Sequence, residues 1–265
     1  MKKLVIALTA LAAFTASASA ADLGARPYAK APAPVLAAPS WTGFYIFGGG
    51  GGGLWSANGG LDNTATGVCI ICTNTRTGGD GWFGTVGAGY DWQTGPAWVF
   101  GIFGDGTFGS LKGNIGDATD PAVVGTTKME TAWAAGARVG YLIAPNVLSY
   151  VNGGYTGTYW TGSTLLNSFN GTASGIHTDS FNTQGWFVGG GVENNLNIFG
   201  INAPGWFMKT EYRAAYLDSK RLQERFDGTN TLVGQDITFK PFVQTISTSL
   251  VYRFNWTGAP IAAKY

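Results

Sequence analysis

The stretch TKMETAWAAGARVGYLI, residues 127–143, alternates between two kinds of side chain. Successive side chains of a β-strand point to opposite faces, so residues of the same parity share a face. Odd positions hold Met129, Thr131, Trp133, Ala135, Ala137, Val139 and Tyr141, and even positions hold Lys128, Glu130, Ala132, Ala134, Gly136, Arg138 and Gly140. Charge therefore lies on one face, and most large apolar groups lie on the other.

Strands of a secreted β-sandwich also alternate between apolar and polar side chains, so the composition of the polar face is what distinguishes a membrane barrel from a sandwich. In a sandwich this face is solvated, and small residues on it would contribute little. Here charge is mixed with Gly and Ala, which suits a crowded lumen, while Trp, Tyr, Val and Phe on the other face suit lipid with aromatic girdles. The same pattern recurs in 206–217 and 239–254. We therefore favour the barrel.

The segments and their connections predict the strand number. Three connections are short, around 94–95 and 144–146 and over 197–204, as expected for periplasmic turns. Four are long, as expected for surface loops: 54–81, 111–126, 161–183 and 219–238. We predict an all-β fold, an eight-stranded antiparallel up-and-down transmembrane β-barrel over residues 41–265, although 54–81 could hold a further hairpin. Its strands are 41–53, 82–93, 96–110, 127–143, 147–160, 184–196, 205–218 and 239–254.

Two segments precede the predicted barrel. Residues 1–20 combine two lysines, a short apolar core and a small-residue SASA site, which is the pattern of a secretory signal peptide. Residues 21–40 contain four of the ten prolines and no apolar period, which predicts an extended linker. We expect export to the outer membrane of a Gram-negative cell, with both chain ends in the periplasm.

The composition limits the function classes. The chain has 265 residues, with 42 Gly, 14% aromatic and 12% charged residues and a formal net charge of +1, so no basic field indicates nucleic acid. The one histidine, His177, argues against a His-based metal site, and we expect no cofactor. A hydrolytic triad of His177 with Ser174 or Ser180 and Asp179 would lie in a predicted mobile loop. We therefore expect no enzyme activity; a lipid-modifying enzyme is the distant alternative.

Parity assigns ten charged side chains to the lumen, five acids and five bases. Equal numbers allow a closed network, because a buried unpaired charge is costly and a paired, hydrogen-bonded one is tolerated. Side chains can just fill the interior of an eight-stranded barrel. We expect a structural plug of ion pairs; the alternative is a narrow ion path through the same residues. The predicted lumen charges are Asp91, Asp105, Lys128, Glu130, Arg138, Glu193, Lys209, Glu211, Arg213 and Arg253.

Cys69 and Cys72 are the two cysteines of the chain and form CIIC in the first long connection. A metal site would need further Cys or His ligands, and a haem-attachment motif would need His where Thr73 stands. Export favours a loop-closing disulfide, and free or redox-active thiols are the alternative.

Five motifs carry a resemblance to a known family: WTGFY (41–45), GARVGYLIAPNVLSYVNGG (136–154), VGGGVENNL (188–196), KTEYR (209–213) and SLVYRFNW (249–256). Over residues 21–265 the chain resembles the outer-membrane β-barrel proteins of alphaproteobacteria. These are small surface proteins known from Brucella, Bartonella and rhizobia, related at fold level to the OmpA transmembrane domain. The resemblance implies an eight-stranded, porin-like barrel that contributes to envelope integrity and surface interactions.

The resemblance also implies two terminal features. Four residues of the last strand resemble the signal read by the barrel-assembly machinery: Ser247, Ser249, Tyr252 and Phe254. Either Phe254 or Tyr265 would be its terminal aromatic. Ala21 and Asp22 resemble the start through which some members are cross-linked to peptidoglycan, and the alternative is an untethered periplasmic tail.

These features predict an integral outer-membrane protein, a monomer with a structural and surface-display role. Its expected partners are outer-membrane lipid, lipopolysaccharide, the barrel-assembly machinery and, through the tether, peptidoglycan, but no nucleic acid. In the last long connection Lys220, Arg221, Glu224 and Arg225 either contact lipopolysaccharide phosphates or are solvated. The alternative function is a narrow porin for ions or small solutes.

Overall fold

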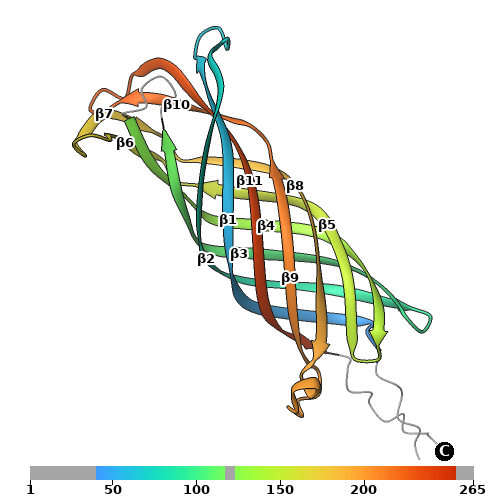
Figure 1. The fold of residues 1–265 in the computed structure, drawn as a ribbon. Helices are drawn as coiled ribbons and strands as arrows, with labels where there is room; N and C mark the ends of the chain where they lie inside the picture. Colours follow the sequence, from blue (N-terminus) through green and yellow to red (C-terminus); the bar gives the residue numbers. More distant parts are fainter. Residues whose placement is uncertain (1–39, 117–122, 255–265) are drawn as a thin grey trace, which may run out of the picture. The chain divides into compact units, whose positions relative to one another are not determined.

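The computed structural model describes residues 40–116 and 123–254, most of which lie in β-strands (Figure 1). The predicted signal peptide and nearly all of the predicted linker lie outside these residues. No helix in the described part of the chain is long and apolar enough to cross a membrane. The elements are β1 (Gly43–Asn63), β2 (Cys69–Thr94), β3 (Trp98–Gly116), β4 (Val123–Ala144), β5 (Val147–Trp160), β6 (Ser163–Asn167), β7 (Ala173–Thr178), β8 (Phe181–Asn195), the 3-10 helix η1 (Leu196–Phe199), β9 (Trp206–Leu217), β10 (Lys220–Phe226) and β11 (Leu232–Arg253).

Eight of these strands close into an antiparallel ring in the order β1-β2-β3-β4-β5-β8-β9-β11. The first and last strands close it, with a register that runs from Tyr45 opposite Arg253 to Asn63 opposite Gln235. Each predicted strand segment overlaps one strand of the ring, so the predicted fold class is confirmed. We call the end with the connections 95–97, 145–146 and 196–205 the turn end, and the opposite end the loop end.

Two belts of outward-facing aromatic side chains surround the barrel. On β3 they are Trp98 and Phe108, and on β11 they are Tyr252 and Phe242, so that each pair is ten positions apart. This separation suits the 9–11 residues with which a tilted strand crosses a bilayer. The turn-side girdle is Phe44, Trp92, Trp98, Tyr141, Trp206, Tyr252 and Phe254, and the loop-side girdle is Trp82, Phe108, Trp133, Tyr155, Trp186, Tyr216 and Phe242.

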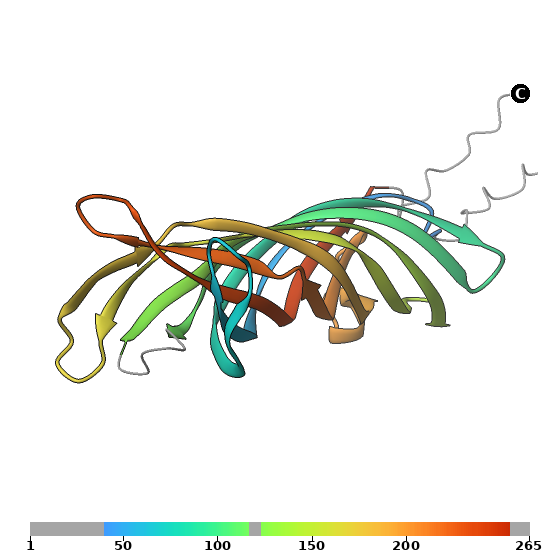
Figure 2. The same ribbon diagram turned by 90° about the horizontal axis from the view of Figure 1, so that it is seen from above.

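The prediction that 54–81, 111–126, 161–183 and 219–238 are loops was wrong for much of their length. β1 and β2 continue as a hairpin beyond the loop-side girdle, and β6, β7 and β10 lie wholly within predicted loops. Backbone N–H and C=O groups that leave the membrane keep their partners when the ladder continues, which favours strand over irregular chain. β6 pairs with β4 and β7, and β10 pairs with β7 and β11, so a second set of pairings joins β4 to β11 at the loop end. Figure 2 shows that the β1–β2 tip and the β6–β7 tip lie apart.

Candidate functional site: the lumen

Four charged side chains meet in the lumen near the turn end. Arg138 on β4 donates from Nε and Nη2 to the two carboxylate oxygens of Asp91 on β2, at 3.0 and 2.5 Å, and from Nη1 to Glu193 on β8 at 3.1 Å. Arg253 on β11 donates from Nε to Glu193 at 2.8 Å, and its Nη2 lies 2.8 Å from Asp91 Oδ2. We call these four residues the turn-side ion cluster. Each is at most 4% exposed, and their charges cancel.

Aromatic rings enclose the turn-side ion cluster. The guanidinium carbon of Arg138 lies 4.5 Å from the ring centre of Tyr45, and that of Arg253 lies 4.3 Å from the ring of Trp41. Trp41 is 1% exposed, and its indole Nε1 donates to the Pro145 carbonyl of the β4–β5 turn at 3.4 Å. Since cation–π packing stabilises a guanidinium most where water is excluded, these rings support the buried charges and narrow the lumen at the turn end.

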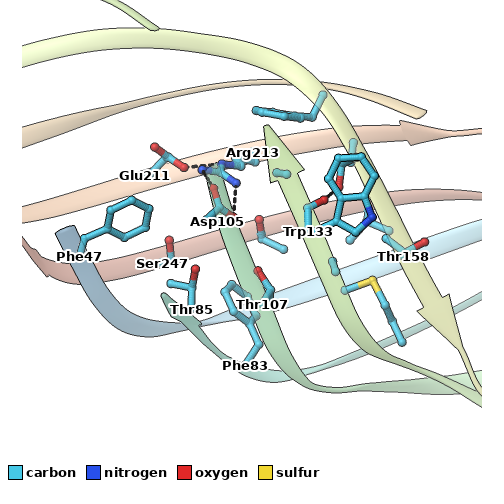
Figure 3. A pocket seen from close by; sticks show the side chains of 18 of the residues that line it. Phe47, Phe83, Thr85, Asp105, Thr107, Trp133, Thr158, Glu211, Arg213 and Ser247 are labelled. Carbon is cyan, nitrogen blue, oxygen red and sulfur yellow. Dashed lines mark hydrogen bonds and ion pairs between the residues drawn. The ribbon is translucent and has the colours of Figure 1, made fainter. Parts of the chain in front are cut away.

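A second cluster lies further toward the loop end, and Figure 3 shows its main ion pairs. Arg213 on β9 donates from Nη1 and Nη2 to the two oxygens of Asp105 on β3, at 2.9 and 2.7 Å, and from Nε to Glu211. Glu211 Oε2 also accepts from the Tyr150 hydroxyl at 2.6 Å and from the Asn152 amide at 2.9 Å. Glu211 therefore has three donors, which is what a buried carboxylate needs.

Lys209 completes this group, which we call the central ion cluster (Asp105, Lys209, Glu211 and Arg213). Its Nζ lies 3.9 Å from Glu211 Oε2, too far for a hydrogen bond, and 3.3 Å from the ring centre of Phe47. Lys209 is therefore held by cation–π packing and by a longer-range ionic contact. Two acids and two bases again leave the cluster without net charge.

Lys128 and Glu130 do not join the lumen network, so the prediction was wrong for this pair. The register of β4 against β5 shifts between Met129 and Thr131, which marks a bulge. An extra residue reverses the parity beyond it, so that Thr127 and Met129 are buried. The Lys128 and Glu130 side chains are 39% and 36% exposed, and they pair with each other at 2.6 Å.

A hydrophobic plug closes the lumen toward the loop end. Trp55, Trp160 and Phe239 meet with ring centres 5.2–5.5 Å apart, and each is at most 2% exposed. The indole of Trp55 donates to the Leu111 carbonyl at 3.1 Å, and that of Trp160 donates to the Thr158 hydroxyl at 2.9 Å. We call Trp55, Trp160, Phe181 and Phe239, whose rings pack together, the loop-side plug.

A cavity of about 70 Å³ lies beside the central ion cluster (Figure 3). Its wall combines the charges of the central ion cluster with hydroxyl groups, among them Thr85, Thr107 and Ser247, and with apolar groups such as Phe83 and Phe187. A polar cavity of this size is large enough for several water molecules.

Sequence reasoning missed the loop-side plug because Trp55 and Phe181 fall in segments predicted to be loops. A signal was present: Trp55, Ala57 and Leu61 keep the inward parity of the first strand past residue 53, and all three are at most 2% exposed. Continued alternation beyond the membrane length indicates a strand that extends past the bilayer.

The terminal features predicted from the resemblance are placed only in part. Ser249 is 2% exposed on the lumen side, and Tyr252 and Phe254 lie in the turn-side girdle with their rings 5.1 Å apart. Ser247 lines the cavity of about 70 Å³ beside the central ion cluster. Recognition of these residues by the assembly machinery stays a prediction. Ala21, Asp22 and Tyr265 lie outside the described residues.

Cys69 is disulfide-bonded. The side chain of Cys72, the other cysteine of the chain, lies outside the described residues, so the pairing of Cys69 with Cys72 stays a prediction. Within the ranges 40–116 and 123–254, no group of three or more His, Cys, Asp or Glu side chains is arranged to hold a metal ion.

His177 lies at the end of β7, and its Nδ1 is 2.7 Å from Asp227 Oδ1. The Ser174 hydroxyl donates to the Leu165 carbonyl at 2.7 Å. In the structure His177 therefore contacts a carboxylate of the β10–β11 turn, and its Nε2 lies 4.0 Å from Asp179 Oδ1, while Ser174 is engaged within the β6–β7 hairpin. The absence of enzyme activity stays a prediction.

A closed antiparallel ring with two outward aromatic girdles and an interior of paired charges defines an integral outer-membrane β-barrel. The chain belongs to the outer membrane protein beta-barrel domain family, whose family model matches residues 6–254. It is 30% identical over 260 residues to the 31 kDa outer-membrane immunogenic protein of Brucella melitensis biotype 1, covering 96% of this chain and 100% of that protein. The protein of the same name from Brucella suis biovar 1 matches with the same figures.

A solved structure agrees with this architecture. The outer membrane protein OprG from Pseudomonas aeruginosa superposes with a TM-score of 0.50 at 9% identity, over 80% of this chain and 97% of OprG. At this identity the likeness concerns the fold alone. Family, relatives and fold together place the protein in the cell outer membrane.

Proposed function

We propose that this protein is a non-catalytic structural and surface-display barrel whose lumen is closed to solutes. The observation that supports this most directly is the filling of the lumen at successive levels by the turn-side ion cluster, the central ion cluster and the loop-side plug. Trp41 and Trp160, near opposite ends of this stack, are at most 1% exposed. An open diffusive path would keep such side chains in contact with water.

The strand extensions at the loop end support the display part of the proposal. β6, β7 and β10 and the β1–β2 hairpin lie beyond the loop-side girdle, and the tip residue Phe169 is 88% exposed. The Brucella relatives are named immunogenic outer-membrane proteins, and we propose that the loop end of this chain is exposed at the cell surface. The turn end and both chain ends would then lie in the periplasm.

A narrow porin is the second candidate, and the cavity of about 70 Å³ beside the central ion cluster is the observation that favours it. The test is single-channel conductance of the refolded mature protein, residues 21–265, in planar bilayers. We expect silence from a sample that shows heat-modifiable gel migration. Steady, reproducible openings would overturn the closed-lumen proposal and make the central ion cluster the first target for selectivity variants.

The proposal includes a tether to peptidoglycan through Ala21 and Asp22, which rests on the resemblance of these residues alone. Cell-wall sacculi boiled in detergent should retain the protein and release it after muramidase digestion. Replacement of Asp22 should abolish this retention. Equal release of the wild type and the variant before digestion would contradict the tether and show that the N-terminal segment is an untethered tail.

A further inference from the structure

A groove of about 490 Å³ lies on the outer wall of the barrel, where β4, β5, β8 and β9 pass the loop-side girdle. Trp133, which is 50% exposed, lines the groove from within the girdle, and Asp218 and Lys220 line it from the β9–β10 link. We propose that this groove binds the saccharide headgroup of an outer-leaflet glycolipid, the sugar-phosphate part of lipopolysaccharide. The inference rests on the orientation proposed above, with the loop end outside the cell.

The level of the groove along the barrel, relative to the membrane, supports binding of a headgroup rather than an acyl chain. Along the outer face of β8, Trp186 is followed toward the loop end by Gln184 and Asn182, and along β9 Tyr216 is followed by Asp218. Outward side chains therefore change from aromatic to polar at one level, which is where the hydrocarbon region ends and the headgroups begin. Gln184, Asn182 and Asp218 all line the groove.

The aromatic side of the groove suits a sugar ring. Trp133 is paired with Gly157 across the β4–β5 ladder, and a Cβ on Gly157 would lie 2.5 Å from the indole Nε1 and 2.8 Å from Cε2. The indole therefore lies against the wall in the space that Gly157 leaves open. Tyr159, the next outward residue of β5, continues this surface. Flat aromatic surfaces of this kind pack against the apolar faces of sugar rings, while the polar edges of Trp and Tyr remain available for hydrogen bonds.

The polar side of the groove suits hydroxyl groups. The side chains of Asn182 and Gln184 are exposed, and within residues 40–116 and 123–254 neither amide makes a hydrogen bond, so each offers donors and an acceptor to a ligand. The Asp218 carboxylate accepts from sugar hydroxyls, and the Lys220 ammonium attracts a phosphate group. Because one acid accompanies one base, the groove has no net charge. The match is therefore to a saccharide that carries a phosphate, not to a purely anionic headgroup.

The test is the binding of purified rough lipopolysaccharide to the detergent-solubilised mature protein, measured by thermophoresis. The double variant Asn182→Ala/Gln184→Ala should raise Kd about tenfold, because it removes the amide hydrogen bonds to the ligand. Gly157→Ala should raise Kd as well, because its methyl group displaces the Trp133 indole. The matched control is Gly84→Ala on the outer face of β2, where a Cβ meets only backbone oxygens, at 3.7 and 3.9 Å; its Kd should equal that of wild type.

Two results would overturn the proposal. One is an unchanged Kd for a double variant that retains heat-modifiable gel migration; this variant decides the matter even if Gly157→Ala does not fold. The other is equally tight binding of phosphatidylglycerol, presented in mixed detergent micelles, with the same loss in the double variant, which would make the groove a general lipid contact. Since the assay is independent of conductance, either failure leaves the proposal of a closed lumen standing.

Discussion

Arg138 on β4 reaches Asp91 on β2 across the intervening strand β3, directly over Gly101. Gly101 is paired with Asp91 on one side and with Arg138 on the other. A Cβ at Gly101 would lie 2.0 Å from Asp91 Oδ1 and 3.2 Å from Arg138 Cγ. The two-point ion pair therefore exists because the strand between its partners carries no side chain at that level.

Tyr150 and Glu211 repeat this arrangement across β8. Gly191 lies between them in the ladder, and a Cβ there would lie 2.7 Å from the Tyr150 hydroxyl that donates to Glu211. Glycine in these strands thus leaves room for lumen contacts between side chains that are two strands apart.

We expect Gly101→Ala to lower the free energy of unfolding by roughly 3 kcal/mol, since it separates a buried ion pair without removing either charge. Urea unfolding in lipid vesicles measures this change. Gly104→Ala on the outer face of the same strand is the control, because a Cβ there meets only the Ala134 carbonyl oxygen at 3.7 Å. Equal losses in the two variants would show that the ion pair over Gly101 is not what the barrel depends on.

Glu211→Gln and Glu130→Gln should differ in stability although both remove one negative charge. Glu211 is 5% exposed and lies beside Arg213 and Lys209, so its neutralisation leaves buried positive charge and should cost about 3 kcal/mol. The Glu130 side chain is 36% exposed, and its loss should cost at most about 0.5 kcal/mol. Unfolding of the two variants under one set of conditions compares them directly, and a larger effect at Glu130 would contradict the assignment of the central ion cluster.

Lys209→Met should cost less than Arg213→Met, about 2 kcal/mol, because it leaves one buried negative charge uncompensated while Glu211 keeps its three hydrogen-bond donors. Arg213→Met removes both hydrogen bonds that Asp105 receives from Arg213, and should cost roughly 3 kcal/mol or more. Thermal unfolding followed by gel migration distinguishes the two. A reversed order would mean that Lys209, not Arg213, is the main counter-charge in the lumen.

Asp227→Ala should loosen the loop end and leave the barrel unchanged. The His177–Asp227 contact of 2.7 Å is partly exposed, so its loss should cost at most about 1 kcal/mol and only within the extension formed by β7 and β10. Limited proteolysis should cut the segment 161–183 faster in the variant. A matching fall in the unfolding temperature of the whole barrel would show that the extension and the membrane ring unfold as one unit.

Much of the membrane ring was predictable because lipid imposes a simple rule. Every strand that crosses the bilayer must present apolar side chains on one face over about ten residues, and this requirement is visible in stretches such as 127–143 without knowledge of any neighbour. The aromatic girdles follow from the same requirement. Eight of the ten side chains predicted for the lumen, including Arg138 and Glu211, lie in the two ion clusters.

The bulge at Met129–Thr131 could not be read from parity. A bulge is a mismatch in pairing between two strands, and here β4 shifts against both β3 and β5 at the same level. Nothing in the local pattern of Lys128 and Glu130 differs from that of an inward pair. Their outward position follows from how three strands align.

By itself the sequence determined the strand faces, the ring of eight and the neutral balance of the lumen, because each depends on local alternation and on counting charges. Only the tertiary structure decided which charges meet, where the lumen is sealed, that the ladder continues past the membrane, and that Trp133, Gln184 and Lys220 share one groove. These depend on the register between strands that lie from tens to more than a hundred residues apart in the chain, which is set by packing across the whole barrel.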